Sequence, residues 1–184
     1  MILEIVKFGH PVLRTKGARI AQVDAKIRKL AADMLETMVA AHGVGLAAQQ
    51  VGVPIQLAVI DVAGIEDRPS TMLIGGRPVA IEAHMPLVLL NPELTLSKDK
   101  EAGNEGCLSF PEISAEIARS RGVKAKAHLL NGGTIEFEAT GLLARALQHE
   151  VDHLNGVLFI DRMSSAAKAG LAGKLKRLQR EVRG

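Results

Sequence analysis

The sequence is poor in aromatic residues and in cysteine. Tryptophan and tyrosine are absent, and phenylalanine occurs four times in 184 residues, although hydrophobic residues make up 47% of the chain. The core must therefore be built from leucine, isoleucine, valine, alanine and methionine. The single cysteine, Cys107, excludes an intrachain disulfide, which is typical of a reducing compartment, and makes this thiol a candidate for chemistry or metal binding.

The sequence also lacks signals for a membrane or for secretion. No apolar run approaches the roughly 18 residues that span a bilayer. The N-terminal stretch MILEIVKFGHPVLR has no basic n-region, no long apolar region and no small-residue cleavage site of the kind a signal peptide needs. We therefore expect a cytoplasmic protein without a membrane partner, in which residues 1–184 form one domain with a core of its own.

The net charge of +3 is unevenly spread. The last 17 residues contain one acid and six bases, whereas the rest has 19 acids and 17 bases. The six bases are Lys168, Lys174, Lys176, Arg177, Arg180 and Arg183. A basic tail suits contact with nucleic acid or a ribonucleoprotein surface, and the alternative is a solvated amphipathic helix.

Hydrophobic periodicity predicts a helix near each end of the chain. Asp24 is a candidate N-cap, apolar residues follow at helical spacing, and the pattern stops at His42 and Gly43. The basic tail predicts a final helix over residues 165–182.

Apolar and alternating segments predict strands between these helices. The predicted strands cover residues 55–62, 86–97, 123–130 and 134–139. Asn91-Pro92 interrupts the second of these strands, and Asn131-Gly132-Gly133 is a strong hairpin signal between the last two. Residues 63–85 predict a long loop or a short hairpin.

Residues 141–155 switch to helical spacing and are apolar on every side, which is typical of a buried helix. The pattern as a whole predicts an α+β fold, in which antiparallel β-strands surround one central helix, with an N-terminal helix and a C-terminal helix.

The central helix contains Gln148-His149-Glu150-Val151-Asp152-His153, which includes the pattern H-E-x-x-H. His149 and His153 lie one turn apart and can bind one metal ion, while Glu150 can act as a general base without being a ligand. Asp152 is a candidate to orient an imidazole, and a surface or capping role is the alternative.

The third metal ligand is open on this pattern alone. Downstream of His153 the only acids are Asp161, which follows an expected strand VLFI, and Glu181. Upstream stands Cys107, within the sequence Glu-Gly-Cys-Leu-Ser; a thiolate with two imidazoles leaves a fourth position for water, as in catalytic zinc sites. A buried, inert cysteine is the competing interpretation.

A third segment, GVGLAAQQ at residues 43–50, combines glycines with Gln50. The glycines allow close approach of the backbone to a ligand, and the amide of Gln50 could donate to a developing oxyanion. Alone, such a segment is more often a tight turn between a helix and a strand.

Taken together, GVGLAAQQ, EGCLS and QHEVDHLNG resemble the three signature motifs of peptide deformylases in order and in approximate spacing. The resemblance extends from His10-Pro11 to the basic tail and is closest to the bacterial type. It implies a single catalytic domain that hydrolyses N-formylmethionyl peptides of newly made proteins and releases formate.

The resemblance also implies a role for individual residues. Cys107, His149 and His153 would hold the metal, and Glu150 would be the acid and base. Gln50 and the backbone N–H of Leu108 would stabilise the oxyanion. The implied substrate-binding residues are Val44, Gly45, Leu142, Arg145 and His149.

The implied metal is Fe(II), one per chain, with zinc, nickel or cobalt as substitutes, because a thiolate suits borderline and redox-active metals. The implied partners are nascent formylmethionyl peptides and the ribosome, the latter through the basic tail, without sequence-specific binding to nucleic acid.

The chain departs from the family pattern at two places. Residues 63–85 are longer than in compact bacterial members, so this segment could cover or reshape the peptide groove. Arg145 stands where the family's methionine pocket is usually lined, and we expect its aliphatic stem to line the pocket with the charge turned outward.

Two other functions compete with this interpretation. One is a metallopeptidase that cuts internal peptide bonds, which the lack of a clear downstream ligand disfavours. The other is a metal-holding or ribosome-binding module without activity, which would need neither Glu150 nor Gln50.

Overall fold

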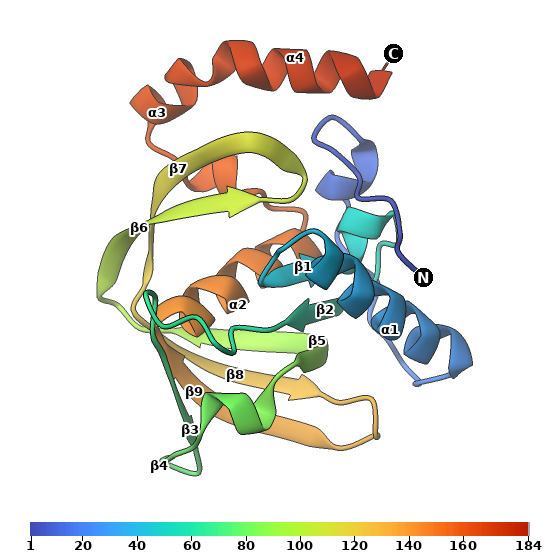
Figure 1. Ribbon diagram of the computed structural model, residues 1–184, viewed down its shortest axis with the longest axis vertical. Helices are drawn as coiled ribbons and strands as arrows, with labels where there is room; N and C mark the ends of the chain where they lie inside the picture. Colours follow the sequence, from blue (N-terminus) through green and yellow to red (C-terminus); the bar gives the residue numbers. More distant parts are fainter. Residues whose placement is uncertain (184) are drawn as a thin grey trace.

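The computed structural model describes residues 1–183 and places the helix α2 (Gly141–Leu154) at the centre of the molecule. A larger sheet lies on one side of α2, and a strand pair and the C-terminal helices lie on the other (Figure 1). α1 (Ala25–Ala40) packs at one end. This arrangement confirms the α+β class with antiparallel strands around a central helix.

The larger sheet is antiparallel, with the order β1-β2-β5-β8-β9-β3-β4. Its strands are β1 (Gly45–Ala47), β2 (Leu57–Ile60), β3 (Ser70–Ile74), β4 (Arg77–Pro78), β5 (Leu87–Leu96), β8 (Gly122–His128) and β9 (Thr134–Thr140). The predicted strands correspond to β2, β5, β8 and β9, and residues 63–85 contain the short hairpin of β3 and β4.

β5 continues through Asn91-Pro92, although the sequence predicted an interruption there. The pairing with β8 shifts register between Leu90 and Glu93, so the strand bends without ending. Asn91 adopts a φ of 51° and exchanges two hydrogen bonds with the backbone of Ile20, at 2.8 and 2.9 Å.

A second antiparallel pair, β6 (Lys100–Cys107) and β7 (Phe110–Ser120), was not predicted. The two strands meet in a tight turn in which Cys107 pairs with Phe110. The EGCLS segment therefore lies at the end of this hairpin, which faces α2 across a pocket described below.

α1 begins after Asp24, whose carboxylate accepts the backbone N–H of Ile27 at 2.9 Å, as the sequence predicted. Its buried Met34 and Met38 pack with Leu46 of β1 and Leu57 of β2. The aliphatic core predicted from the composition is thus present.

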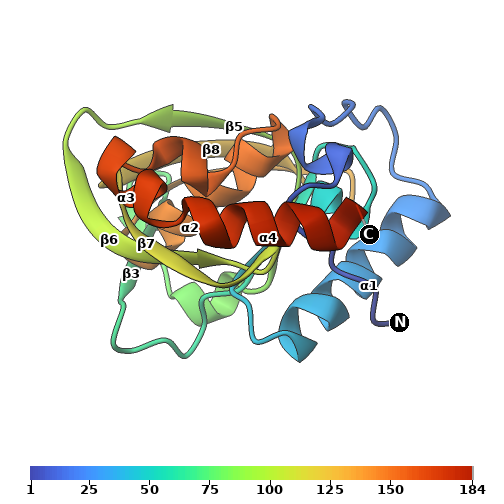
Figure 2. The ribbon, with the colours of Figure 1, turned by 90° about the horizontal axis from the view of Figure 1, so that it is seen from above.

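The basic tail forms two helices where one was predicted. α3 (Ser165–Gly170) has Leu171 as its C-cap, and α4 (Ala172–Arg183) follows and lies over β6 and β7 (Figures 1 and 2). Segment VLFI, expected as a strand, lies partly in the 3₁₀ helix η4 (Phe159–Arg162).

Three further 3₁₀ helices complete the described elements: η1 (Pro11–Arg14), η2 (Ala48–Val51) and η3 (Ile81–His84). Within residues 1–183, every helix is too short or too polar to cross a lipid bilayer.

Candidate active site and metal centre

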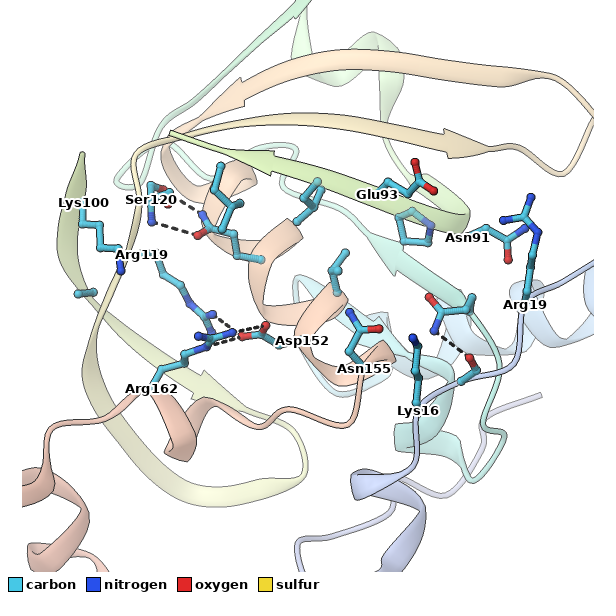
Figure 3. A pocket seen from close by; sticks show the side chains of 18 residues that line it. Lys16, Arg19, Asn91, Glu93, Lys100, Arg119, Ser120, Asp152, Asn155 and Arg162 are labelled. Atoms are coloured by element: carbon cyan, nitrogen blue, oxygen red, sulfur yellow. Dashed lines mark hydrogen bonds and ion pairs between the residues drawn. The ribbon is translucent and has the colours of Figure 1, made fainter. Parts of the chain in front are cut away.

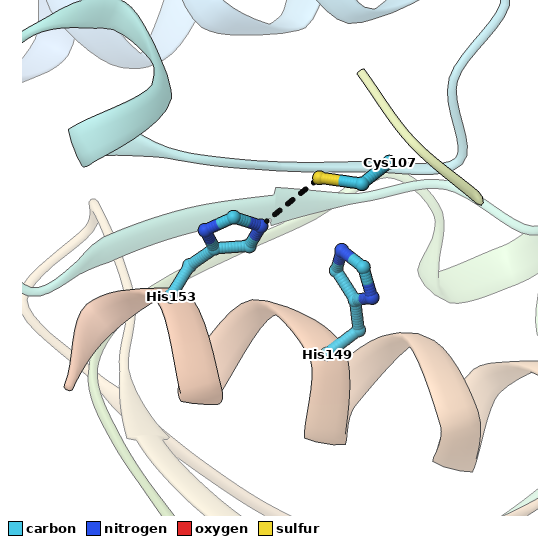
Figure 4. Close-up of side chains that lie close together, drawn as sticks. All are labelled: Cys107, His149 and His153. Atoms are coloured by element: carbon cyan, nitrogen blue, oxygen red, sulfur yellow. Dashed lines mark hydrogen bonds between the residues drawn. The ribbon is translucent and has the colours of Figure 1, made fainter. Parts of the chain in front are cut away.

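Three side chains that could bind a metal converge above α2. The ligand atoms of Cys107, His149 and His153 all lie within 4.8 Å of one another (Figure 4). Cys107 Sγ is 3.3 Å from His153 Nε2, and both histidines are buried. The turn between β6 and β7 supplies the sulfur, and successive turns of α2 supply the two imidazoles.

This donor set fits a borderline transition metal, because one sulfur and two nitrogens leave a coordination position for substrate or water. Burial lowers the pKa of His153 well below its ordinary value, which keeps this ring neutral, as a metal ligand must be. For His149, burial opposes protonation, but Glu150, Cys107 and Glu105 together raise its pKa well above the ordinary value. These three neighbours therefore favour a positive charge at the position of His149.

Glu105 fixes the orientation of His149. Its Oε1 lies 2.9 Å from His149 Nδ1, an arrangement in which Nδ1 donates and Nε2 is left for a metal. The buried guanidinium of Arg119 donates to both carboxylate oxygens of Glu105 at 2.9 Å. Burial disfavours the charged form of Glu105, but the hydrogen bonds from His149 and Arg119 hold its pKa well below the usual range.

Arg145 belongs to the same buried cluster, contrary to the expectation that its charge turns outward. Its Nη1 donates to Glu105 Oε2 at 2.8 Å and to the carbonyl of Ile117 at 2.9 Å. Its Nη2 donates to the carbonyl of Glu101 at 2.9 Å. The guanidinium is therefore neutralised inside the protein while the residue still lines the pocket.

Glu150 is buried, and its Oε1 has no hydrogen-bond partner among the described residues. Burial raises the pKa of Glu150 to about 7, although the charge of His149 opposes this shift. A Cβ atom on Gly45 would lie 2.5 Å from Glu150 Oε2. Gly45 therefore leaves the space that the Glu150 carboxylate occupies. This is a second reason for a glycine at this position, in addition to the close approach of a ligand to the backbone.

Gln50 is held with its amide nitrogen toward the sulfur. Its Oε1 accepts the backbone N–H of Ala47 at 3.0 Å, and its Nε2 donates to Ser109 Oγ at 3.2 Å and Cys107 Sγ at 3.6 Å. Leu108 follows Cys107 and lines the same pocket. Gln50 and Leu108 therefore both line the pocket beside the sulfur.

The pocket has a volume of about 610 Å³ and contains every site residue implied by the family resemblance except His153, which belongs to the metal cluster. Predicted substrate-binding residues in its wall are Val44, Gly45, Leu142, Arg145 and His149. The sequence missed Glu105 and Arg119 as functional candidates; the only local signal was the glutamate two residues before Cys107.

The remaining acids do not join the metal cluster. Asp152 faces a separate polar pocket, where it pairs with Arg119 at 2.6 Å and Arg162 at 2.9 Å (Figure 3), so it does not orient an imidazole directly. Asp161 pairs with Arg14 and accepts the backbone N–H of Leu158. Glu181 lies on α4 and lines a different pocket.

Comparison with known proteins gives a consistent result. The model of the polypeptide deformylase family matches residues 2–169. A peptide deformylase of Methylacidiphilum infernorum is 49% identical over 180 residues, which cover 98% of this chain and 94% of the relative. A plant peptide deformylase structure aligns with a TM-score of 0.83 and 36% identity, covering 97% of this chain and 90% of the other. The peptide deformylase structure from Thermotoga maritima aligns with a TM-score of 0.76 and 39% identity, covering 89% of this chain and 99% of the other.

Proposed function

The chain belongs to the peptide deformylase family and removes the N-formyl group from nascent peptides, and we propose that the 610 Å³ pocket is its active site. The observation that carries this proposal is the convergence of the three ligand atoms with the buried Glu150. We further propose that residues 1–184 act as one catalytic domain in the cytoplasm, where nascent formylated peptides arise.

Cys107, His149 and His153 would hold the metal of this metalloenzyme, which we propose to be Fe(II). When bound, the metal polarises the formyl carbonyl as a Lewis acid and lowers the pKa of water. Glu105 keeps the His149 ring oriented for binding through its contact with Nδ1.

Glu150 is the proposed acid and base. It takes a proton from the water that attacks the formyl carbon, and it delivers that proton to the amine nitrogen as the carbon–nitrogen bond breaks. Burial keeps the carboxylate at the floor of the pocket and out of bulk water. Gln50 Nε2 and the Leu108 backbone N–H would donate to the oxygen that gains negative charge.

The formylmethionyl end would lie along Val44 and Gly45, at the edge of the sheet, and the methionine side chain would enter beside Leu142, Arg145 and His149. Arg145 can line an apolar pocket because its charge is paired with Glu105. The basic residues of α3 and α4 are the proposed contact to the ribosome.

The test compares three substrates. Formyl-Met-Ala-Ser should release formate, acetyl-Met-Ala-Ser should react far more slowly because the extra methyl crowds the carbonyl carbon, and casein should stay intact. Glu150→Gln should lose roughly 10²–10⁴ in rate, the usual worth of acid–base catalysis, and keep its metal. Casein cleavage that depends on Glu150, without formate release, would support a metallopeptidase instead.

A further inference from the structure

The loop between β2 and β3 contributes one charged side chain, Arg68, to the wall of the active-site pocket. This loop passes beside β6 (Figure 1). Arg68 Nη2 donates to the carbonyl of Asn104, in β6, at 3.1 Å. The contact ties the guanidinium to the strand that leads into Cys107.

The residues directly after Arg68 are attached to the first turn of α2. The carbonyl of Pro69 accepts the N–H of Leu142 at 3.3 Å, and Ser70 Oγ accepts the N–H of Leu143 at 2.9 Å. Arg68 is therefore fixed between β6 and α2, next to Leu142 in the pocket wall. Its position is defined by contacts on both sides.

The charge of Arg68 is not neutralised by this protein. Within residues 1–183, no carboxylate oxygen lies within 4.0 Å of its guanidinium, and the side chain is exposed. Of the acids in the same pocket, Glu105 is paired with Arg119 and Arg145, and Glu150 is buried. The remaining acid, Glu112, is exposed at the start of β7, whereas Arg68 is held at the level of Asn104, which pairs with Glu116.

We propose that Arg68 determines substrate specificity by attracting an acidic side chain in the first two residues after formylmethionine. The inference rests on the proposed use of this pocket for the peptide. An extended peptide leaving the metal centre passes a wall with a fixed, unpaired guanidinium, whose planar fork suits a carboxylate.

The expected effect is modest and acts on binding. Partly exposed ion pairs change affinity by about two- to fivefold. Arg68 forms no hydrogen bond or ion pair with Cys107, His149, His153 or Glu150 in the described chain. The change should therefore fall on KM, leave kcat nearly constant and shrink as salt rises.

The experiment measures KM and kcat for formate release from formyl-Met-Ala-Ser and from peptides with Asp or Lys at the second or the third residue. Arg68→Gln removes the charge and retains a donor for the Asn104 carbonyl. Arg68→Glu reverses the charge. Arg77→Glu is the matched control, because Arg77 is an exposed arginine of the adjacent hairpin that lies outside this pocket.

The wild-type enzyme should show a lower KM for Asp than for Lys at one of the two positions, by about two- to fivefold. The difference should vanish in Arg68→Gln, reverse in Arg68→Glu and persist in Arg77→Glu. Equal KM values for Asp and Lys in the wild type, or the same preference in Arg68→Gln, would overturn the proposal. Formate release from formyl-Met-Ala-Ser reports separately on the proposed function.

Discussion

Cys107 supplies the sulfur donor of the proposed metal site, 3.3 Å from His153 Nε2. A thiolate binds borderline metals more strongly than a neutral hydroxyl does, so Cys107→Ser should lose most of its metal and its formate release. Anaerobically purified wild-type protein should contain about one iron per chain. Elemental analysis measures the metal content of the variant and the iron content of the wild type. Full metal content in Cys107→Ser would remove Cys107 from the ligand set, and an air-stable, fully active zinc enzyme would refute iron.

Gly45 leaves room for Glu150, because a Cβ there would lie 2.5 Å from Glu150 Oε2. The carboxylate is buried and has little space in which to move. Gly45→Ala should therefore displace Glu150 and lower kcat by about 10²-fold, within the range that acid–base catalysis contributes. Steady-state formate release measures this, with metal content unchanged.

Gly173→Ala is the matched control for Gly45→Ala. A Cβ on Gly173 would meet no atom within 4 Å, and this residue lies on α4, outside the active-site pocket. The control should keep wild-type kcat. If Gly45→Ala also kept it, the glycine would not be needed to position Glu150.

Local sequence patterns predicted the site residues that depend on short spacing. His149 and His153 are one helical turn apart. The local pattern left the third ligand open, and Cys107, the only thiol of the sequence, was implied in that role by the family resemblance. The Glu105 cluster could not be predicted in this way, since its partners Arg119 and Arg145 are 14 and 40 residues away and come from β7 and α2. The inward direction of the Arg145 charge follows from Glu105 and two backbone carbonyls, which only the folded chain brings together.

Among the elements, α2 has an N-terminal cap from a distant part of the chain. Its N-cap residue Thr140 makes no side-chain capping bond, and Ser70 Oγ accepts the N–H of Leu143 instead. Loss of a helix cap typically costs about 1 kcal/mol, so Ser70→Ala should lower the free energy of unfolding by about that amount. Urea denaturation measures it.

Ser165→Ala serves as the control for Ser70→Ala, because Ser165 is exposed at the start of α3 and Ser164 provides the cap of that helix. It should change stability by less than about 0.5 kcal/mol, as surface substitutions usually do. Equal stability of the Ser70→Ala variant and the wild type would show that water replaces the hydroxyl at no cost.

Periodicity found β2, β5, β8 and β9 and missed the pair β6 and β7, although β7 has buried Phe110, Ile113 and Ile117. β6 has largely exposed side chains and is held by backbone pairing with β7, so it carries no hydrophobic signal. The tail was predicted as one helix because its amphipathic pattern continues through Leu171, where the structure begins a new helix between Gly170 and Gly173.

At the scale of the whole molecule, the C-terminal helix is part of the core. Leu175 and Leu178 of α4 are buried in a cluster with Phe8, Phe110 and Phe159. Removing the tail would expose this cluster, next to the strand pair that carries Cys107. A variant that lacks the tail could therefore lose ribosome binding because its core is disrupted, and it would not test docking by the basic residues.

Lys176, Arg180 and Arg183 are exposed and follow one another at helical spacing on α4. If this face contacts the ribosome, replacing the three with Gln should weaken association and make it less sensitive to salt, because each lost phosphate contact removes roughly 0.7–0.9 from the slope of log affinity against log salt. Formate release from short peptides should be retained, since the buried Leu175 and Leu178 are unchanged. Cosedimentation at several salt concentrations measures the association.

The matched control removes the same charge from the opposite end of the molecule, where β4, β8 and β9 lie away from α4 (Figure 1). Its substitutions are Arg77→Gln, Lys124→Gln and Lys126→Gln. All three residues are exposed, and each belongs to the larger sheet. If net charge alone drew the protein to ribosomal RNA, both triple variants would lose affinity equally, and the proposal of a docking face on α4 would fail. A docking face requires that only the α4 variant lose affinity, because interactions between exposed charges are largely screened beyond about 8 Å at physiological salt.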